Sequence, residues 1–236
     1  MKIAIMQPYL FPYIGYFSLI CNTDRFVFFD TPQYIRKGWI NRNRIISSSG
    51  EPIYFTVPTQ KAARETAINQ ILINNEEQWQ EKLYGQLSVY KNKAPYYAKV
   101  LELVHEVVDG EKNMIWELAI DSVMKTCNYL GIDKPFDVFS KMNLPGVVAN
   151  APDEWALSIS KALGCDTYVN PPGGMRFFDR DKYKTAGIKL QFLQQELIPY
   201  VQKLGRFVEG LSIIDLMMFC KEDEIRGMME HYELSE

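Results

Sequence analysis

A strand–helix–strand pattern in the first 30 residues most constrains what this chain can fold into. Apolar runs at 3–6 and 26–29 have the length and composition of buried strands, and they stop at Gln7 and Asp30. Between them, residues 11–20 form an aromatic, helix-like stretch. Two buried strands joined by a helix are the unit from which parallel sheets are built. The pattern therefore predicts an α/β fold with a mainly parallel sheet flanked by helices.

Patterns over the rest of the chain predict one domain, residues 1–236, with a helical insertion at about 76–131. The chain has 236 residues and 47% hydrophobic content, which is enough for one sizeable core. In the insertion, Asn75 is expected to cap the first of three helices and Gly131 to end the third. A capping box is expected at Ser212 and Asp215, before a last helical region. Further elements are expected as a hairpin of 44–48 with 53–58, strands at 136–139, 166–169 and 188–193, and a helix between 152 and 164.

The charge distribution favours a small anionic ligand over a long polyanion. The formal net charge is −3, which does not favour binding to DNA. Residues 1–44 nevertheless hold six cations and two acids, whereas the tail from Lys221 holds two cations and six acids. A local basic patch on an acidic protein fits a compact anion.

Cysteine and histidine usage argues against a metal site and against a Ser-His-Asp triad. Four cysteines are scattered without a CxxC pair, and two histidines are present, His105 and His231. Such a set does not supply a zinc site, and we expect no metal and no cofactor. The N-terminus runs straight into a strand, and no apolar stretch reaches ~20 residues. The sequence predicts a reduced, soluble, cytoplasmic protein without membrane insertion.

Polar residues follow three of the predicted strands at the point where each strand ends. Ligands of open α/β sheets bind beyond the carboxyl ends of the strands, which meet at one edge if the strands are parallel. We therefore expect Gln7, Asp30 and at least one of residues 41–43 to line one cleft. The polar groups are Gln7, then Asp30 with Gln33 and Tyr34, and then Asn170 with Gly173 and Gly174.

Residues 33–44 have the composition of a site for a polar, anionic and partly planar ligand. The segment carries four cations, two asparagines, a glutamine, a tyrosine and a tryptophan in twelve residues. A core strand cannot bury these groups without partners. If the segment is extended, Asn41 and Asn43 share one face and Arg42 points the other way, as a separate contact for an anion.

Several of these residues also have structural interpretations, which stay open. They concern packing and ion pairs inside the fold, without any ligand. The alternatives are a turn cap at Gln7, an ion pair of Asp30 with Arg42 or Arg44, solvated charges at Arg36 and Lys37, packing of Trp39, and an ordinary turn at Gly173 and Gly174.

Five motifs in this chain resemble those of one protein family. They are QPYLFPYIGYF at 7–17, DRFVFFD at 24–30, GWINRNR at 38–44, YVNPPGG at 168–174 and LSIIDL at 211–216. Together they resemble the WbqC-like protein family over nearly the whole chain. The resemblance implies a bacterial transferase of surface-polysaccharide synthesis, especially of the O-antigen of lipopolysaccharide. It implies transfer of an acyl group, such as glycine, from an activated acyl or aminoacyl donor, such as an aminoacyl-tRNA, to a nucleotide-linked amino sugar.

The residues and the resemblance together predict roles for individual side chains. Amide formation needs a deprotonated amine and stabilisation of an oxyanion. Asp30 is the expected general base, and Asn41, Asn43 or backbone N–H groups near Gly173 are expected to stabilise the oxyanion. Arginine and lysine at 36, 37 and 42 are expected on a diphosphate. The expected substrate-binding residues are Gln7, Tyr9, Gln33, Tyr34, Arg36, Lys37, Trp39, Arg42, Asn170, Gly173 and Gly174.

The alternative function is binding without catalysis. The same segment would then serve a sugar-nucleotide-binding protein, or a partner of a glycosyltransferase, in the same pathway.

Overall fold

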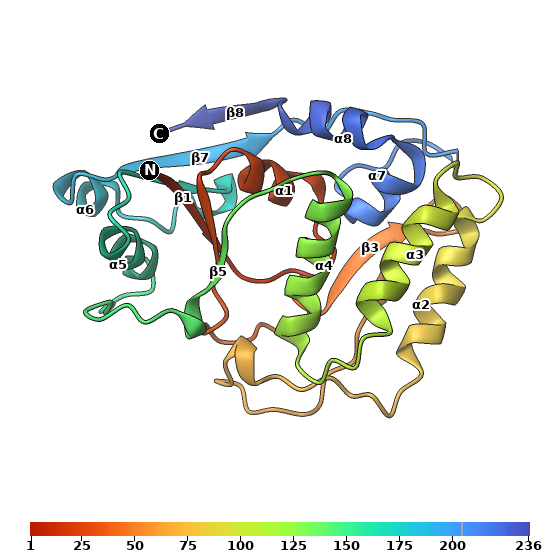
Figure 1. Ribbon diagram of the computed structural model, residues 1–236, viewed down its shortest axis with the longest axis horizontal. Coiled ribbons are helices and arrows are strands. Elements are labelled where there is room, and N and C mark those ends of the chain that lie inside the picture. Colours follow the sequence, from red (N-terminus) through yellow and green to blue (C-terminus); the bar gives the residue numbers. More distant parts are fainter. Residues whose placement is uncertain (204) are drawn as a thin grey trace.

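A six-stranded sheet forms the centre of the computed structural model, which describes residues 1–203 and 205–236 (Figure 1). The strand order is β5–β2–β1–β6–β7–β8. Strands β1, β2, β5, β6 and β7 run parallel, and β8 is antiparallel to β7. This confirms the predicted α/β fold with a mainly parallel sheet. The bounds are β1 Lys2–Met6, β2 Arg25–Phe28, β5 Phe136–Val138, β6 Thr167–Asn170, β7 Lys189–Gln195 and β8 Tyr232–Ser235.

Alternate side chains of the sheet enter two separate hydrophobic cores. On β1, Ala4 belongs to the larger core, while Ile3 and Ile5 belong to the smaller one. On β2, Phe26 belongs to the larger core and Val27 to the smaller. Successive side chains of a strand point to opposite faces, so both faces of the sheet are covered. A strand buried on both faces needs apolar side chains throughout, which explains the uninterrupted apolar runs.

Helix α1, Ile14–Cys21, connects β1 to β2 and begins three residues later than predicted. Phe11 has a φ of 40°, outside the helical region, and Pro12 follows it. The side-chain amide of Asn43 donates to the carbonyls of Leu10 and Phe11, at 3.1 and 2.9 Å. These bonds hold the 10–13 turn out of the helix, and they come from a distant strand that local sequence cannot reveal.

Strands β3, Arg42–Ile46, and β4, Pro52–Thr56, form the predicted hairpin as a separate two-stranded sheet. Its first strand begins two residues earlier than predicted. The reason is Asn43, whose buried amide bonds to the 10–11 turn and brings a polar residue inside the strand.

Three helices lie in the segment predicted to be helical, namely α2 Trp79–Leu87, α3 Tyr97–Val108 and α4 Ile115–Tyr129 (Figure 1). Asn75 does not cap α2, so that prediction is wrong. Its side-chain oxygen instead accepts the indole N–H of Trp79 at 3.3 Å, and α2 begins only at Trp79. Gly131 follows α4 with a φ of 66°, the left-handed conformation that the prediction required.

The C-terminal third supplies the helices of the smaller core and the last strands. Ser212 caps α7 as predicted, because its hydroxyl accepts the Ile214 amide at 3.3 Å. Asp215 does not complete a capping box, since it is buried against two tyrosines. The described helices include none that is long and apolar enough to cross a membrane. The helices are α5 Glu154–Ala162, α6 Arg180–Thr185, α7 Ile213–Phe219 and α8 Glu222–Met229, and short 3-10 turns lie at Ile68–Gln70, Ser88–Tyr90, Phe139–Lys141 and Pro172–Gly174.

Candidate functional site

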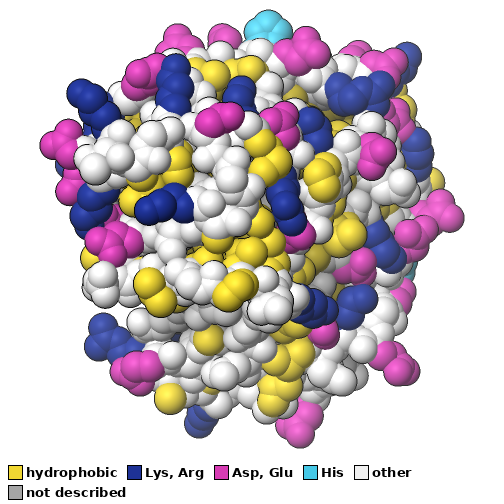
Figure 2. All heavy atoms as spheres, turned by 60° about the vertical axis from the view of Figure 1, so that its left-hand side comes forward, with side chains coloured by type: hydrophobic (Ala, Val, Ile, Leu, Met, Phe, Trp, Pro, Cys, Tyr) yellow, Lys and Arg dark blue, Asp and Glu magenta, His cyan; other side chains and the backbone are white. Residues whose placement is uncertain are grey.

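A cleft lies beyond the carboxyl ends of β1, β2 and β6. Its volume is about 730 Å³, which is typical of sites for small ligands. Its walls come from the turns after these three strands, from the start of α5 and from the loop at 171–178. We call it the sheet-edge cleft. Figure 2 turns the left-hand side of Figure 1 forward and shows hydrophobic side chains exposed among charged ones on that face.

Six of the predicted substrate-binding residues line the sheet-edge cleft. They meet there because each ends a strand of the parallel sheet or lies in the segment that follows one. These residues are Gln7, Tyr9, Gln33, Asn170, Gly173 and Gly174.

Asn170 is held in the cleft wall by its neighbours. Its side-chain oxygen accepts the hydroxyl of Tyr168 at 2.8 Å, and its amide donates to the carbonyl of Pro171 at 3.0 Å. Burial raises the pKa of Tyr168 well above its usual value, so this hydroxyl stays a donor at neutral pH. Gly174 packs so closely that a Cβ there would collide with Asn170 and with Phe178. The glycine therefore serves the packing of the wall.

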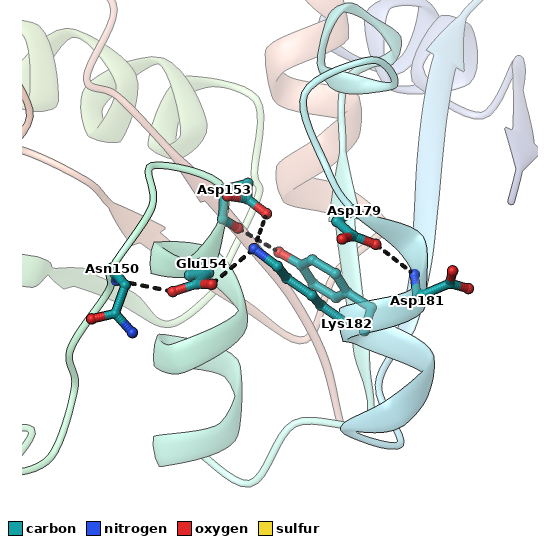
Figure 3. A network of polar contacts seen from close by, with 7 residues as sticks. Asn150, Asp153, Glu154, Asp179, Asp181 and Lys182 are labelled. Carbon is teal, nitrogen blue, oxygen red and sulfur yellow. Dashed lines mark hydrogen bonds and ion pairs between the residues drawn. The ribbon is translucent and has the colours of Figure 1, made fainter.

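An ion-pair cluster joins α5 to α6 outside the cleft lining. Figure 3 shows Lys182 of α6 reaching two acids at the start of α5. Its Nζ lies 3.1 Å from Asp153 and 2.8 Å from Glu154, and Glu154 also accepts the backbone amide of Asn150 at 2.9 Å. Trp155, the next residue along, lines the cleft. The cluster thus ties α5, which supplies part of the cleft wall, to α6.

Asp30 lies behind the cleft and does not line it. The residue is fully buried. Its carboxylate accepts the backbone amide of Ser140 at 3.0 Å and also the Ser140 hydroxyl, and its carbonyl accepts the Asn69 amide at 2.9 Å. Asp30 therefore joins the end of β2 to two 3-10 turns. The expected ion pair of Asp30 with Arg42 or Arg44 is not what the structure shows.

Asn41 and Asn43 are buried within the hairpin region, away from the cleft lining. The amide of Asn41 donates to the carbonyl of Val57 at 2.7 Å, and its side-chain oxygen is buried without a partner among the described residues. The side-chain amide of Asn43 donates to the carbonyls of the 10–11 turn, and its side-chain oxygen accepts the backbone amide of Arg44 at 2.8 Å. The expectation that Gln7, Asp30 and one of residues 41–43 line one cleft is wrong, because only Gln7 does so.

The basic and aromatic residues of segment 34–42 lie beside the cleft. Tyr34 and Arg36 line a neighbouring pocket. Trp39 is half exposed and packs near Tyr54, with 6.3 Å between ring centroids. Arg42 lies 4.2 Å from the centroid of that tyrosine ring, and it donates to the carbonyl of Lys37. Arg42 and Trp39 are thus engaged with the hairpin.

Several aromatic residues of the cleft were not predicted as site residues from the sequence. Trp155 lies at a helix position where an apolar side chain indicates core, and Phe29 ends an apolar strand. Phe177 is 52% exposed and lines the cleft. The sequence does contain an indication of this wall, because the PPGG turn follows the predicted strand 166–169 and two phenylalanines, Phe177 and Phe178, come shortly after it. The aromatic residues lining the cleft are Tyr9, Phe29, Trp155, Tyr168, Phe177 and Phe178.

The fold and the cleft define an open α/β protein with a cleft at the carboxyl edge of its sheet, the place where ligands of such folds bind. Residues 7–227 match the WbqC-like protein family, so the chain belongs to that family, as its motifs predicted. The chain is similar to the uncharacterized protein Rv1507c of Mycobacterium tuberculosis (strain ATCC 25618 / H37Rv), with 26% identity over 219 residues and 92% of each chain covered. No solved structure matches the chain.

Proposed function

We propose that this protein binds a nucleotide-linked amino sugar in the sheet-edge cleft and transfers an acyl group, such as glycine, to the sugar amine. The observation that carries the proposal is the lining of the cleft. The amides of Gln7, Gln33 and Asn170 lie beside six aromatic side chains, and the described lining residues include no charged side chain. Amides donate and accept hydrogen bonds, so they suit sugar hydroxyls, and ring faces cover the apolar faces of a sugar.

The pathway follows from the family rather than from the cleft. In our proposal the acylated sugar enters the O-antigen or another surface polysaccharide of a bacterium. The donor is an activated acyl or aminoacyl group, such as that of an aminoacyl-tRNA.

The reaction is amide formation. The neutral amine attacks the acyl carbonyl, a C–N bond forms, the bond between the carbonyl carbon and its carrier breaks, and the amine proton leaves with the carrier. Amide oxygens in the cleft can orient the amine, while amide N–H groups and the backbone near Gly173 can stabilise the oxyanion. Asp30 and Asn43 act as positioning residues in this proposal, because their side chains bond to the turns at Ser140 and at residues 10–11, whereas Asn41 bonds to Val57 at the end of the hairpin.

One observation favours a second candidate function, binding without catalysis. The described residues that line the cleft include no histidine, lysine or carboxylate, the usual general bases. A protein of this kind would hold a sugar nucleotide for a partner glycosyltransferase.

Titration calorimetry with nucleotide-linked amino sugars tests the proposed binding. Gly173 lines the cleft and a Cβ on it would meet nothing within 4 Å, so Gly173→Leu adds bulk to the cleft wall at a position where the new Cβ has room. We expect it to weaken binding at least about tenfold, the effect of roughly 1.4 kcal/mol. Gly85→Leu, on the exposed side of α2 where a Cβ also meets nothing, is the matched control. Equal affinity in both variants would overturn the proposed site.

Mass spectrometry separates the two candidate functions. The wild-type protein is mixed with the sugar nucleotide that it binds and with an activated acyl donor. An enzyme yields the N-acylated sugar, whereas a binding protein leaves the sugar unchanged at the same affinity.

A further inference from the structure

We propose that a second pocket, next to the sheet-edge cleft, binds the diphosphate of the same ligand. The pocket has a volume of about 530 Å³, and its lining includes Tyr34, Arg36, Thr59, Gln60 and Arg64. We call it the arginine pocket. The identity of the whole ligand rests on the proposed function, but the affinity of this pocket for a diphosphate can be measured by itself.

The two pockets lie next to each other. Gln33 and Ile35 line both of them. One side of this short segment therefore faces the neutral, aromatic cleft and the other faces the arginines. A ligand with a neutral sugar and a charged diphosphate has the same division along its length.

The arginine pocket carries an excess of positive charge. Its lining includes two cations, Arg36 and Arg64, and no carboxylate. Neither Arg36 nor Arg64 forms an ion pair within the described part of the chain. Unpaired guanidinium groups around a concave surface attract an anion and hold it in bidentate geometry.

Backbone contacts fix the two walls of the pocket against each other. Gln33 and Ala67 form an antiparallel bridge, and the Tyr34 amide donates to the carbonyl of Thr66 at 2.9 Å. The Arg36 guanidinium donates to the carbonyl of Ala62, also at 2.9 Å. The wall at 59–66 is thus held in place opposite the basic segment, although its residues gave no signal in the sequence.

Tyr34 supplies an uncharged donor in the lining of the arginine pocket. Its side chain is 8% exposed. Burial raises the pKa of Tyr34, and this outweighs Thr59, Arg36 and Arg42, which act to lower it. The hydroxyl is therefore protonated at neutral pH. Guanidinium groups combined with hydroxyl and amide donors match the oxygens of a phosphate better than those of a neutral group.

Calorimetric titration with inorganic pyrophosphate tests the arginine pocket. We expect the wild-type protein to bind pyrophosphate, and Arg64→Ala to weaken this binding about tenfold, as for loss of one charge-assisted contact. Lys61→Ala removes the same charge from the same loop but outside the pocket lining. It should therefore lower the affinity for pyrophosphate by less than about twofold. Undetectable binding by the wild type, or equal losses in the two variants, would overturn the inference.

A second comparison separates the failure of this inference from failure of the proposed function. Gly173→Leu should keep its affinity for pyrophosphate while losing affinity for the nucleotide-linked sugar. If Arg64→Ala weakens the binding of pyrophosphate but leaves the affinity for the nucleotide-linked sugar unchanged, the pocket does not hold the diphosphate of that ligand and the inference fails. If pyrophosphate binds as expected but no nucleotide-linked sugar does, the proposed function fails and the diphosphate site stands.

Discussion

The adjacent glycines of the 171–174 turn, Gly173 and Gly174, differ in how tightly they are packed. A Cβ on Gly174 would lie 2.8 Å from Cε2 of Phe178 and would also collide with the Asn170 amide, whereas a Cβ on Gly173 meets nothing within 4 Å. We predict that Gly174→Ala destabilises the protein by about 1–3 kcal/mol, because both neighbours must move. Gly173→Ala should leave stability unchanged. Thermal melts of the two variants measure the difference, and equal melting temperatures would contradict this packing.

Arg42 stabilises the hairpin in this structure, although its sequence context suggested a ligand contact. Its guanidinium lies over the Tyr54 ring at 4.2 Å and donates to the Lys37 carbonyl. Arg42→Lys keeps the charge but loses the planar donor, so we predict a loss of about 0.5–1 kcal/mol in stability. Chemical unfolding measures this loss, and pyrophosphate affinity should fall less than in Arg64→Ala. If Arg42→Lys lowered the affinity for pyrophosphate more than Arg64→Ala does, Arg42 would have to be a ligand contact.

Helix α7 is anchored by a buried carboxylate in its first turn. Asp215 accepts the hydroxyls of Tyr90 and Tyr200, both at 2.5 Å, and the amide of Gln202 at 3.0 Å. It thereby ties α7 to the turn after α2 and to the chain that leads into the helix. Asp215→Asn leaves at least one donor without an acceptor, and we predict a loss of about 1–3 kcal/mol in stability.

The effect of Asp215 should depend on pH. Burial raises the pKa of Asp215 above 3.8, against the three hydrogen bonds, which lower it. A raised pKa in the folded state means that stability from this group is fully present below the unfolded pKa and is lost as pH rises through the folded pKa. The difference in unfolding free energy between wild type and Asp215→Asn should therefore be larger near pH 4 than at pH 7. Urea unfolding across this range checks the sign, and a difference that grows with pH would contradict it.

Element types could be predicted where one physical pattern dominates. The apolar runs predicted strands β1 and β2, and Gly131 predicted the end of α4. The starts of two helices, α1 and α2, were predicted wrongly because side-chain hydrogen bonds decide them. The start of α1 depends on the Asn43 amide from β3, and Asn75 receives a hydrogen bond from Trp79 in place of capping α2. Strand β8 was not predicted, because a largely exposed four-residue strand, with the sequence YELS, has no core pattern.

Strand β8 protects one edge of the whole sheet. It pairs with β7 from Phe192 opposite Ser235 to Gln195 opposite Tyr232. Deleting residues 232–236 would expose the β7 edge, which offers unpaired backbone groups to other molecules. We predict a lower melting temperature and concentration-dependent association, measured by light scattering. A truncated chain that stays monodisperse and equally stable would contradict this role.

The candidate site could be predicted in part from the sequence. Gln7, Gln33 and Asn170 meet because parallel strands bring their carboxyl ends to one edge, and that step needed only the strand pattern. Asp30 follows the same rule in sequence, yet it turns inward to Ser140, because a 3-10 turn from another segment offers it two donors. The wall at 59–66 could not be predicted, because its place opposite Arg36 depends on long-range backbone pairing.

A crystal structure of the protein with a bound nucleotide-linked amino sugar tests the proposed site most directly. The sugar should lie in the sheet-edge cleft, between the amides of Gln7, Gln33 and Asn170, and the diphosphate should face Arg36 and Arg64. A ligand bound at any other surface, with the sheet-edge cleft left empty, would contradict the proposed function.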